Sequence, residues 1–419
     1  MEEDFLKNTI LPLYFEKEPS ITDTLDLCRE DDDFRMVYFA EDGERKLVIK
    51  HTSNSFTDAE RIESWARLID EYNRLGIYCP RIVPNRLGET AHTYTEGGRK
   101  YFIYAEEFSK YPSAEKIGIE KLEGETGRLI YTDDVLRSVG KVAAARLDCC
   151  DFRSVYCLLE PYSAEETTDE GTEYAIDFRD FVYKEIPEFR SRMDGLMELF
   201  YKNQEELRKV YYELPTSCFQ ADLNYTNILV DENNSFAGVI DFNLCGREVN
   251  LNYAVRAAMW MAYDKRLYNE NDEALFYYNE ELDEARNAII INNLKLIGES
   301  YEYSEKEREA FQKEKEAFLK TQLQVKAQES LANNNLPINF SKYVLGETEE
   351  DTDSNIQELK TVWEEALNKS VNERLQTNKP QAGNTSSSVS MTKADFNQLP
   401  YTERQALMDK DPKILTKLK

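Results

Sequence analysis

The chain has 419 residues, and its 80 Asp and Glu outnumber its 52 Lys and Arg, which gives a formal net charge of -28. Single hydrophobic cores stop growing at roughly 250–300 residues, so this length predicts more than one domain. The acidic balance argues against a nucleic-acid binder and against a polybasic membrane anchor, because both need clustered Lys and Arg. We expect a cytoplasmic protein without a membrane span, since no apolar run approaches roughly 18 residues.

The first part of the chain reads as a small sheet with one helix. Phe34–Ala40 and Arg45–Lys50 are two β-rich runs around an Asp-Gly turn, which predicts a hairpin that ends near Lys50. Thr57–Glu60 has the pattern of a capping box, and apolar residues follow it at helical spacing. Lys100–Ala105 is a further strand. The order of these elements indicates an antiparallel sheet with one helix against it.

The next part, up to about residue 300, reads as mainly helical. Helices are expected at 133–148, 174–192 and 194–213. A short hairpin follows, formed by Asn227–Asp231 and Phe236–Phe242, with acidic residues at its ends.

Three polar residues near that hairpin point to phosphoryl transfer. Asp222 lies in the loop before the first strand, Asn227 begins that strand, and Asp241 ends the second. Transfer of phosphate from ATP needs a carboxylate for the attacking hydroxyl and oxygen ligands for Mg²⁺. The spacing allows all three side chains to converge on one site. The alternative is that Asp222 and Asn227 only cap turns, as Asp and Asn commonly do.

Residues 1–300 resemble the aminoglycoside phosphotransferase and choline kinase-like group of small-molecule kinases. The motif of that group is H-x-D-x-x-x-x-N followed by two hydrophobic residues and D-F/W. Here it reads Gln220-x-Asp222-x-x-x-x-Asn227 and Val239-Ile-Asp241-Phe242. The resemblance implies an α+β, protein-kinase-like bilobal fold, with an N-lobe at 1–108 and a mainly helical C-lobe at 109–300.

The resemblance also implies roles for single residues. Asp222 would be the catalytic base, Asn227 and Asp241 would bind Mg²⁺, and Lys50 would contact the phosphates of ATP. The carboxylate partner of Lys50 is expected on the next helix, with Glu60 as first choice and Glu63 as second, although helix capping explains Glu60 equally well. The hinge whose backbone meets adenine would be formed by Glu106, Glu107 and Phe108.

Two departures from the family pattern bear on turnover. The His of the motif is Gln220, and an amide can form the same kind of hydrogen bonds to nearby backbone. The place of a glycine-rich phosphate loop is taken by Cys28–Phe34, which has no glycine and whose four acids, Glu30–Asp33, would repel phosphate. We therefore expect an ATP- and Mg²⁺-dependent kinase, with a pseudokinase of the same fold as the alternative.

Charge offers a hint about the acceptor. Residues 1–300 carry a net charge of -25, and residues 301–419 carry only -3. An acidic cleft concentrates cations, so the first part favours a small hydroxyl acceptor that is cationic, such as an aminosugar or an amino alcohol. The contrast also predicts that two different kinds of protein are joined near residue 300.

The last part of the chain is rich in Lys, Glu, Gln and Asn. Ser304–Glu307 has the pattern of a capping box that opens a charged helix, in which a seam recurs every seven residues and suits a partner helix. The seam consists of Phe311, Phe318 and Val325. We predict a helical segment, a polar linker and a short helical module starting at Thr392–Asp395. Their bounds are 301–376, 377–390 and 391–419.

This part resembles the internal capsid scaffolding proteins of tailed bacteriophages over roughly 305–419. The resemblance rests on the Glu-Lys-rich helix and four further segments: Leu336-Pro337, Tyr343–Glu347, Ile356–Leu375 and Met391–Lys419. It implies that residues 301–419 associate with copies of themselves or bind a phage coat protein. The alternatives are an assembly protein in which the kinase part is a passenger, a solvated tail without a partner, and a misjoined reading frame.

Overall fold

The computed structural model describes residues 5–29, 33–163, 166–377 and 391–417. The chain divides into two compact units, Met1–Glu314 and Lys315–Lys419. The division falls within helix α9 (Glu280–Asn333), which runs without a break through residues 300 and 304. The prediction that a helix begins at Ser304–Glu307 is therefore wrong.

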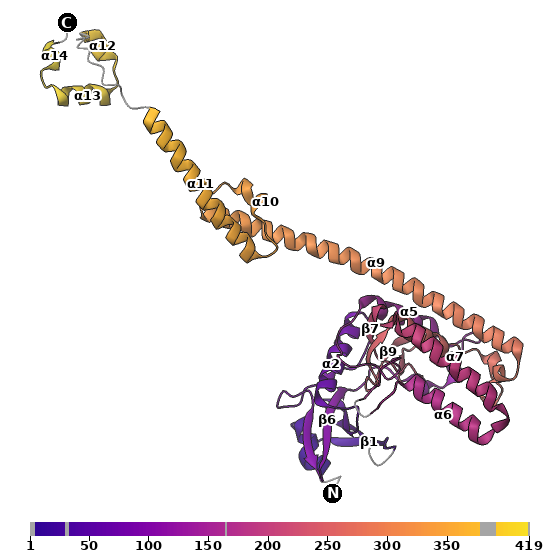
Figure 1. Ribbon diagram of the computed structural model, residues 1–419. Helices are drawn as coiled ribbons and strands as arrows, with labels where there is room; N and C mark the ends of the chain where they lie inside the picture. Colours follow the sequence, from indigo (N-terminus) through magenta and orange to yellow (C-terminus); the bar gives the residue numbers. More distant parts are fainter. Residues whose placement is uncertain (1–4, 30–32, 164–165, 378–390, 418–419) are drawn as a thin grey trace. The chain divides into compact units, whose positions relative to one another are not determined.

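An antiparallel sheet forms the first lobe of unit 1 (Figure 1). Its strand order is β1-β2-β3-β6-β4, and β5 also pairs with β6. The strands are β1 (Ser20–Asp26), β2 (Phe34–Glu41), β3 (Lys46–Ser53), β4 (Ile82–Val83), β5 (His92–Glu96) and β6 (Arg99–Glu107). The predicted hairpin is confirmed as β2 and β3, and its turn holds Gly43 at a φ of 85°, where glycine is favoured. Strand β1 was not predicted because it is an edge strand with no buried residue, so its sequence shows no apolar alternation.

Helix α2 (Ala59–Arg74) packs its apolar face into the core of unit 1. The residues that it buries include Ile62, Trp65, Leu68 and Ile69. Its N-cap is Asp58, whose side chain accepts a hydrogen bond from the Arg61 N–H at 2.8 Å. The predicted capping box at Thr57–Glu60 is therefore wrong by one residue, which leaves Glu60 exposed in the first turn.

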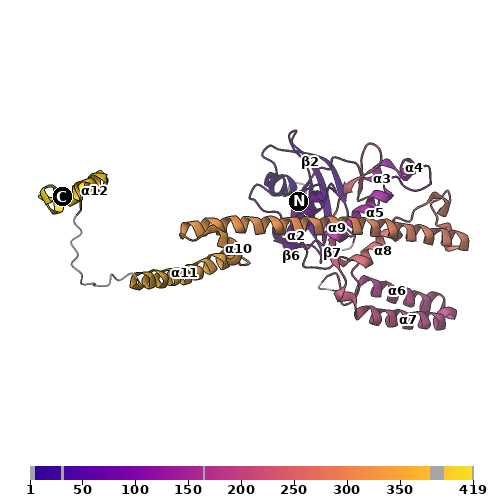
Figure 2. The same cartoon turned by 90° about the horizontal axis from the view of Figure 1, so that it is seen from above.

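The second lobe of unit 1 is mainly helical. Its main helices are α5 (Thr132–Ala145), α6 (Glu170–Glu185), α7 (Arg190–Arg208), α8 (Asn250–Trp260) and the first part of α9, with the short α3 (Ala114–Ile117) and α4 (Ile119–Leu122). Helices α6 and α7 lie side by side (Figure 2). Two small antiparallel pairs join β7 (Thr216–Phe219) to β10 (Gly246–Val249) and β8 (Ile228–Val230) to β9 (Phe236–Val239). The pair β8 and β9 is the predicted second hairpin.

Short helical turns complete unit 1. They are η1 (Leu6–Ile10), η2 (Leu11–Leu13), η3 (Pro187–Phe189), η4 (Tyr211–Glu213), η5 (Lys265–Leu267) and η6 (Leu275–Tyr277). The first two pack on the sheet, where Leu6, Ile10 and Leu11 share a small core with Ile49 and Ile103.

The first part of α9 completes the core of the helical lobe. Ile297 is buried in the main core, and Asn293 is fully buried. The amide of Asn293 donates to the Ala258 carbonyl at 2.9 Å, and its oxygen accepts from Arg128 at 3.0 Å. Helix α5 approaches α9 so closely at Gly140 that a Cβ there would lie 2.4 Å from the Ile297 carbonyl oxygen. Residues of α9 that follow the motif at 220–242 by about 50 positions are thus part of the core of this lobe.

We expect Gly140→Ala to destabilise unit 1 by about 1–3 kcal/mol, because the new methyl group would force α5 and α9 apart. Gly195 provides the control, since it lies in the exposed interior of α7 and a Cβ there meets nothing within 4 Å. Gly195→Ala should stabilise the fold by roughly 0.5–1 kcal/mol through helix propensity alone. Urea unfolding of both variants measures the difference, and equal effects would contradict the close contact of α5 with α9.

A buried carboxylate lies on β10, beside the strand that leads into the Gln220–Asn227 loop. Glu248 is 1% exposed and accepts hydrogen bonds from the Tyr211 hydroxyl at 2.9 Å and the Ser154 hydroxyl at 3.3 Å. Burial raises the pKa of Glu248 to about 7, although its hydrogen bonds oppose the change. The folded protein therefore binds a proton that the unfolded chain releases near pH 4.5.

The stability that this proton contributes is complete below about pH 4.5 and is lost as the pH rises to about 7. We expect the wild type to lose roughly 2–3 kcal/mol of unfolding free energy between pH 5 and pH 8 relative to Glu248→Gln, which cannot titrate. Denaturant unfolding of both proteins at the two pH values measures this difference. Parallel pH profiles would show that Glu248 is ionised throughout the range.

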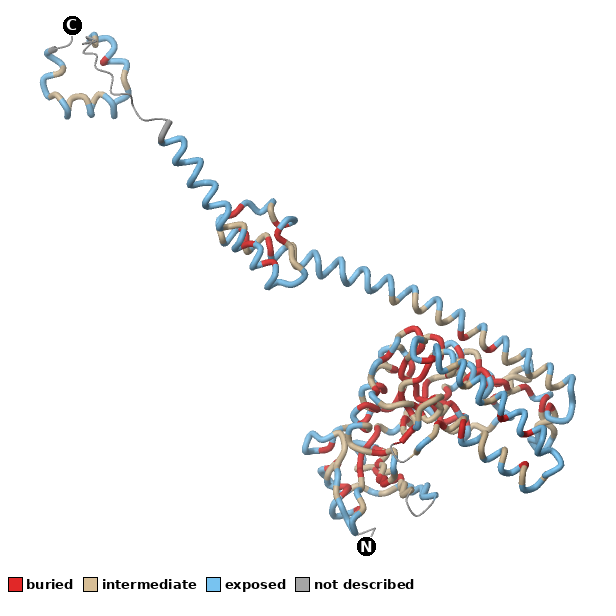
Figure 3. The backbone as a smooth tube through the Cα atoms, in the orientation of Figure 1, coloured by how far each residue is buried: buried red, intermediate tan, exposed pale blue. Residues whose placement is uncertain are grey.

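Unit 2 has a small core of its own. The end of α9 packs against α10 (Ser341–Val344) and α11 (Glu349–Thr377), with η7 (Ile338–Phe340) between them, and Figure 3 shows the buried residues gathered there. The core side chains are Ala327, Leu331, Leu336, Val344 and Ile356. By contrast, the predicted seam is exposed, with Phe311 at 67%, Phe318 at 61% and Val325 at 49%.

The chain ends in three short helices, α12 (Lys393–Gln398), α13 (Tyr401–Lys410) and α14 (Ile414–Lys417). Thr392 and Asp395 form the predicted capping box at the start of α12. The predicted linker at 377–390 lies outside the described residues from position 378 onward. Within the part of the chain that the structure describes, no helix combines the length and apolarity needed to cross a bilayer.

Candidate active site

Gln220 ties together the two loops that carry the predicted carboxylates. Its side chain is fully buried, and its amide donates to the backbone carbonyls of Ile240 at 2.8 Å and Asp241 at 2.6 Å. Its oxygen accepts from the Asp222 N–H at 2.8 Å. An amide thus forms the backbone hydrogen bonds expected at this position, as the sequence predicted.

Asp222 and Asn227 lie in direct contact. The Asn227 amide donates to the Asp222 carboxylate at 2.8 Å, and the Asn224 amide donates to its other oxygen at 2.8 Å. Burial raises the pKa of Asp222, and these hydrogen bonds reduce the rise. A carboxylate with a raised pKa accepts a proton more readily at neutral pH than an ordinary Asp.

Two residues of the site hold a left-handed backbone. Ala221 has a φ of 69° and Asp241 a φ of 61°. For residues other than glycine this conformation costs about 1–2 kcal/mol of free energy, so the surrounding hydrogen bonds must stabilise it. Such strain clusters at functional sites.

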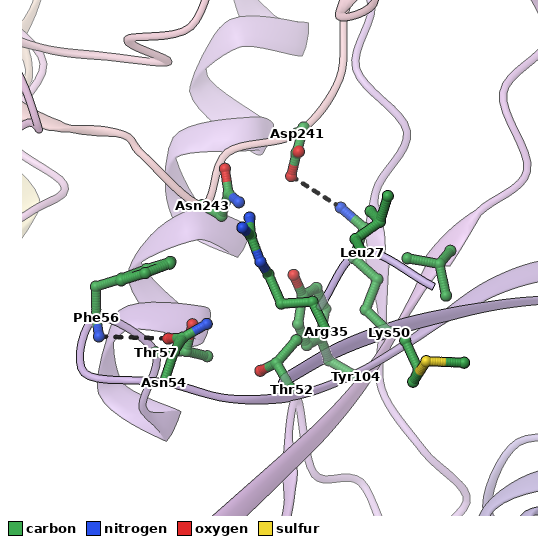
Figure 4. A pocket seen from close by; sticks show the side chains of 12 residues that line it. Leu27, Arg35, Lys50, Thr52, Asn54, Phe56, Thr57, Tyr104, Asp241 and Asn243 are labelled. Atoms are coloured by element: carbon green, nitrogen blue, oxygen red, sulfur yellow. Dashed lines mark hydrogen bonds and ion pairs between the residues drawn. The ribbon is translucent and has the colours of Figure 1, made fainter. Parts of the chain in front are cut away.

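Lys50 lies between two carboxylates. Its Nζ is 2.9 Å from Glu106 and 3.1 Å from Asp241, and Figure 4 shows the lysine reaching Asp241. Burial alone would lower the pKa of Lys50, but the charges of Asp241 and Glu106 outweigh it and hold this pKa well above its ordinary value. Burial also raises the pKa of Glu106, against the opposing effect of Lys50. The lysine is therefore charged in this site.

The predicted partner of Lys50 needs correction. Glu60 and Glu63 are exposed on α2, and the partner is Glu106 on β6. Lys50 is paired with Tyr104 across the two strands, and Glu106 lies two residues along β6, on the same face of the sheet. The sheet itself therefore supplies the carboxylate that the sequence assigned to the helix.

The predicted hinge, Glu106, Glu107 and Phe108, lies at the end of β6. The Glu107 N–H donates to the Arg81 carbonyl at 2.9 Å, and the Phe108 N–H donates to the Lys46 carbonyl at 3.3 Å. These two N–H groups are already hydrogen-bonded, so contact of this segment with adenine stays a prediction for its backbone carbonyls.

Two further residues of the site were missed at the level of sequence. Arg35 and Asn243 line the same cavity as Lys50 and Asp241, and the side chain of Arg35 extends toward Asn243 (Figure 4). Arg35 could have been found, because Val37 pairs with Lys50 and residues 35 and 37 share a face of β2. Arg35 also binds Asp33 at 2.7 Å, so this acid of the predicted repulsive run is neutralised. The rest of the run, residues 30–32, lies outside the described residues.

One cavity of about 720 Å³ joins these groups. Asp222, Asn227, Asp241, Arg35 and Asn243 all line it. Within the described residues, the buried Oδ1 of Asn243 has no hydrogen-bond partner. Amide and carboxylate oxygens are the ligands that Mg²⁺ prefers, so the donor set fits this ion.

A model of the phosphotransferase enzyme family matches residues 26–248, just over half of the chain. The chain belongs to this family. Membership confirms the predicted kinase-like fold and makes the protein a phosphotransferase with a hydroxyl group as acceptor. The phosphotransferase motif at residues 220–242 lies entirely inside the matched segment.

A second model, described as capsid assembly scaffolding protein Gp46, matches residues 262–377 of this phosphotransferase. The predicted resemblance to scaffolding proteins is confirmed, but the match begins near residue 262 and does not include the module at 391–419. Its first part therefore overlaps the helices that complete unit 1. No curated protein matches the phosphotransferase.

Several solved structures are similar to the phosphotransferase at low identity. An amicoumacin kinase in complex with AMP-PNP and Ca²⁺ has a TM-score of 0.39 and 12% identity, over 70% of this chain and 78% of that one. A microcompartment-associated aminopropanol kinase has a TM-score of 0.34 and 15% identity, over 72% and 96%. The macrolide 2'-phosphotransferase of Brachybacterium faecium has a TM-score of 0.33 and 12% identity, over 84% and 98%.

Proposed function

We propose that this phosphotransferase moves the γ-phosphoryl group of ATP to a hydroxyl group of a small molecule, with Mg²⁺. The observation that supports the proposal is the buried Lys50, which forms ion pairs with Glu106 and Asp241. Asp241 lines the same cavity as Asp222 and Asn227, so the lysine lies next to the predicted base and metal ligands. Burying a lysine between two carboxylates costs desolvation free energy, and apolar side chains could fill the same space without this cost. A functional role would explain why the charged residues are present. Contact of the Lys50 ammonium group with phosphate is such a role.

The residues divide the work by their chemistry. Asp222 accepts the proton of the acceptor hydroxyl group. At the same time the hydroxyl oxygen bonds to the γ-phosphorus of ATP, and the bond between this phosphorus and the β,γ-bridging oxygen breaks to release ADP. Lys50 on β3 and Arg35 on β2 place positive charge against the phosphates, next to a segment, Cys28–Phe34, that has no glycine. Gln220 is a positioning residue, because it holds the backbones of Asp222 and Asp241.

Asn227 and Asp241 would hold Mg²⁺, and Asn243 offers a third oxygen beside them. The ion supplies positive charge that neutralises the phosphates when it is bound.

Thermal unfolding of the full chain with and without MgATP tests nucleotide binding. At about 100 times the dissociation constant, a ligand stabilises the folded state by about 2.7 kcal/mol, so a rise in melting temperature is expected. ADP formation against a panel of alcohols then separates an active kinase from a pseudokinase. A chain that binds MgATP and phosphorylates no alcohol would favour the pseudokinase, and a chain that ignores MgATP would overturn both.

The match to scaffolding proteins favours a second function, capsid assembly through the helical tail. The supporting observation is the exposure of large apolar side chains on α9, because Phe318 and Val325 are about half exposed or more. Apolar residues at seven-residue spacing are typical of a helix that packs against another helix. The partner would be a second copy of the chain or a phage coat protein.

We expect the full chain to self-associate and Phe318→Gln with Val325→Gln to weaken this association at least about tenfold, since each substitution removes roughly 1 kcal/mol or more of apolar burial. Sedimentation velocity over a concentration series gives the association constant. Lys320→Gln on the same exposed helix is the control and should leave it unchanged. A wild type that stays monomeric at high concentration would leave coat protein as the partner to test.

A further inference from the structure

A second cavity meets the active site at Asp222. It has a volume of about 370 Å³ and shares Asp222, Asn224 and Tyr156 with the larger cavity that contains Asp241 and Asn227. A molecule in it therefore has access to the carboxylate that we propose as the base. The volume is at the small end of the range for small-molecule sites, roughly 300–1,000 Å³.

The walls of this cavity are aromatic and aliphatic. Six rings line it: Tyr131, Tyr156, Tyr225, Trp260, Tyr263 and Tyr268. Several hold one another in place, since Tyr156 meets Trp260 edge to face at 5.0 Å and Tyr263 stacks on Tyr268 at 5.2 Å. Fixed rings offer flat apolar area at little entropic cost, so they suit a ligand that has an apolar body.

The lining of the cavity itself carries little charge. Asp222 is the one charged residue that lines it within the described part of the chain. The nearby Glu123 is neutralised, because it accepts from the Tyr263 hydroxyl at 2.7 Å and pairs with Lys265 at 2.8 Å. A positive charge is already present, since Arg256 lies 4.2 Å from the centre of the Tyr156 ring. A ligand with several ammonium groups would find one carboxylate in this cavity and one competing cation beside it, whereas Glu166 and Glu170 line only the adjoining larger cavity.

From these walls and charges we infer that the acceptor is an alcohol with an apolar, ring-bearing body and not a polycationic aminosugar. This inference rests on the proposed function, because it names the substrate class of the same site. The hydroxyl lies at Asp222 and the ring lies among Tyr225, Trp260 and Tyr156. Most of the net charge of -25 in the first 300 residues thus lies outside the acceptor cavity.

Saturation-transfer NMR on the full chain tests the inference with two probes, 2-phenylethanol and kanamycin. We expect signals from the aryl alcohol and at least about tenfold weaker binding in Tyr225→Ala, which removes a ring worth roughly a factor of ten. Tyr225 is 53% exposed, so this variant should fold, and Trp260→Leu is a second variant of the same wall. Tyr278→Ala is the control, because Tyr278 is 93% exposed and lies outside the cavity.

The outcomes separate the inference from the proposed function. Binding of kanamycin in preference to the aryl alcohol, or aryl binding that is equal in wild type and Tyr225→Ala, would overturn the inference even if the chain forms ADP with kanamycin. Aryl binding that depends on Tyr225, in a chain that neither binds MgATP nor forms ADP, would support this cavity as an aryl-alcohol site and overturn the proposed kinase.

Discussion

Asp222→Asn is expected to lower the rate of phosphoryl transfer by roughly 10²- to 10⁴-fold, the contribution typical of a positioned general base. Asn has the same shape as Asp but does not accept a proton at neutral pH. Gln220 still holds the backbone of this residue, so the loop should keep its conformation. The measurement is the initial rate of ADP formation at saturating MgATP, with the best alcohol from the acceptor panel.

The pH dependence gives this prediction a second readout. Burial raises the pKa of Asp222, so the wild-type rate should fall on acidification at a pH above the ordinary Asp value of about 3.9. The fall has this sign because protonation removes the base. Asp222→Asn should lose that acid limb while its melting temperature still rises with MgATP.

Asp177→Asn provides a matched control, since it makes the same chemical change on the exposed surface of α6. We expect its rate to equal that of the wild type. Equal rates for Asp222→Asn and the wild type would show that another group accepts the proton.

Local sequence patterns predicted the elements that carry the site. The hairpin of β2 and β3 and the hairpin of β8 and β9 both have β-rich runs around turn residues, and both formed as expected. The spacing of Asp222 and Asn227 also sufficed, because five residues of loop bring the two side chains into hydrogen-bond contact. These features depend on short stretches of chain, which is why sequence reasoning reached them.

The features that sequence missed depend on distant parts of the chain. The pairing of Lys50 with Glu106 requires the register of β3 against β6, which are separated in the sequence by helix α2 and the strands β4 and β5. The start of α9 was missed although Asn279 caps it, with its side-chain oxygen accepting from the Leu282 N–H at 3.2 Å. Ser304–Glu307 has the sequence pattern of a helix start but lies inside the continuous helix. The residues that line the aromatic cavity are spread from position 119 to position 268, so no local sequence pattern predicted it.

Lys50→Met is expected to cost about 3–5 kcal/mol of unfolding free energy and to abolish the thermal shift with MgATP. The side chain of Lys50 is 13% exposed and that of Glu106 is 12% exposed, so the substitution leaves a buried carboxylate without its cation. Urea unfolding measures the first effect. Lys46→Met on the same strand is the control, because Lys46 pairs with Glu41 at 3.5 Å on the surface, and its loss should change stability by less than about 0.5 kcal/mol.

A double-mutant cycle separates the structural effect of Lys50 from its proposed contact with phosphate. Glu106→Gln in the Lys50→Met background removes the uncompensated charge, so we expect it to restore about 1–2 kcal/mol of the lost stability. Nucleotide binding should stay lost, because no cation returns to the phosphate site. If the double variant regains both stability and the MgATP shift, then Lys50 only balances charge and Arg35 alone meets the phosphates.

The pH range of this experiment follows from the direction of the Lys50 shift. Asp241 and Glu106 hold the pKa of Lys50 above its ordinary value despite burial, so the ammonium stabilises the fold fully below about pH 10 and loses this effect only above its raised pKa. Measurements near pH 7 therefore record the whole contribution of the ion pair. The cycle is best run at pH 8, because Glu248, with a pKa of about 7, still titrates near pH 7. A cost that is equally large for Lys46→Met would mean that the sheet, and not the buried pair, sets the stability of this lobe.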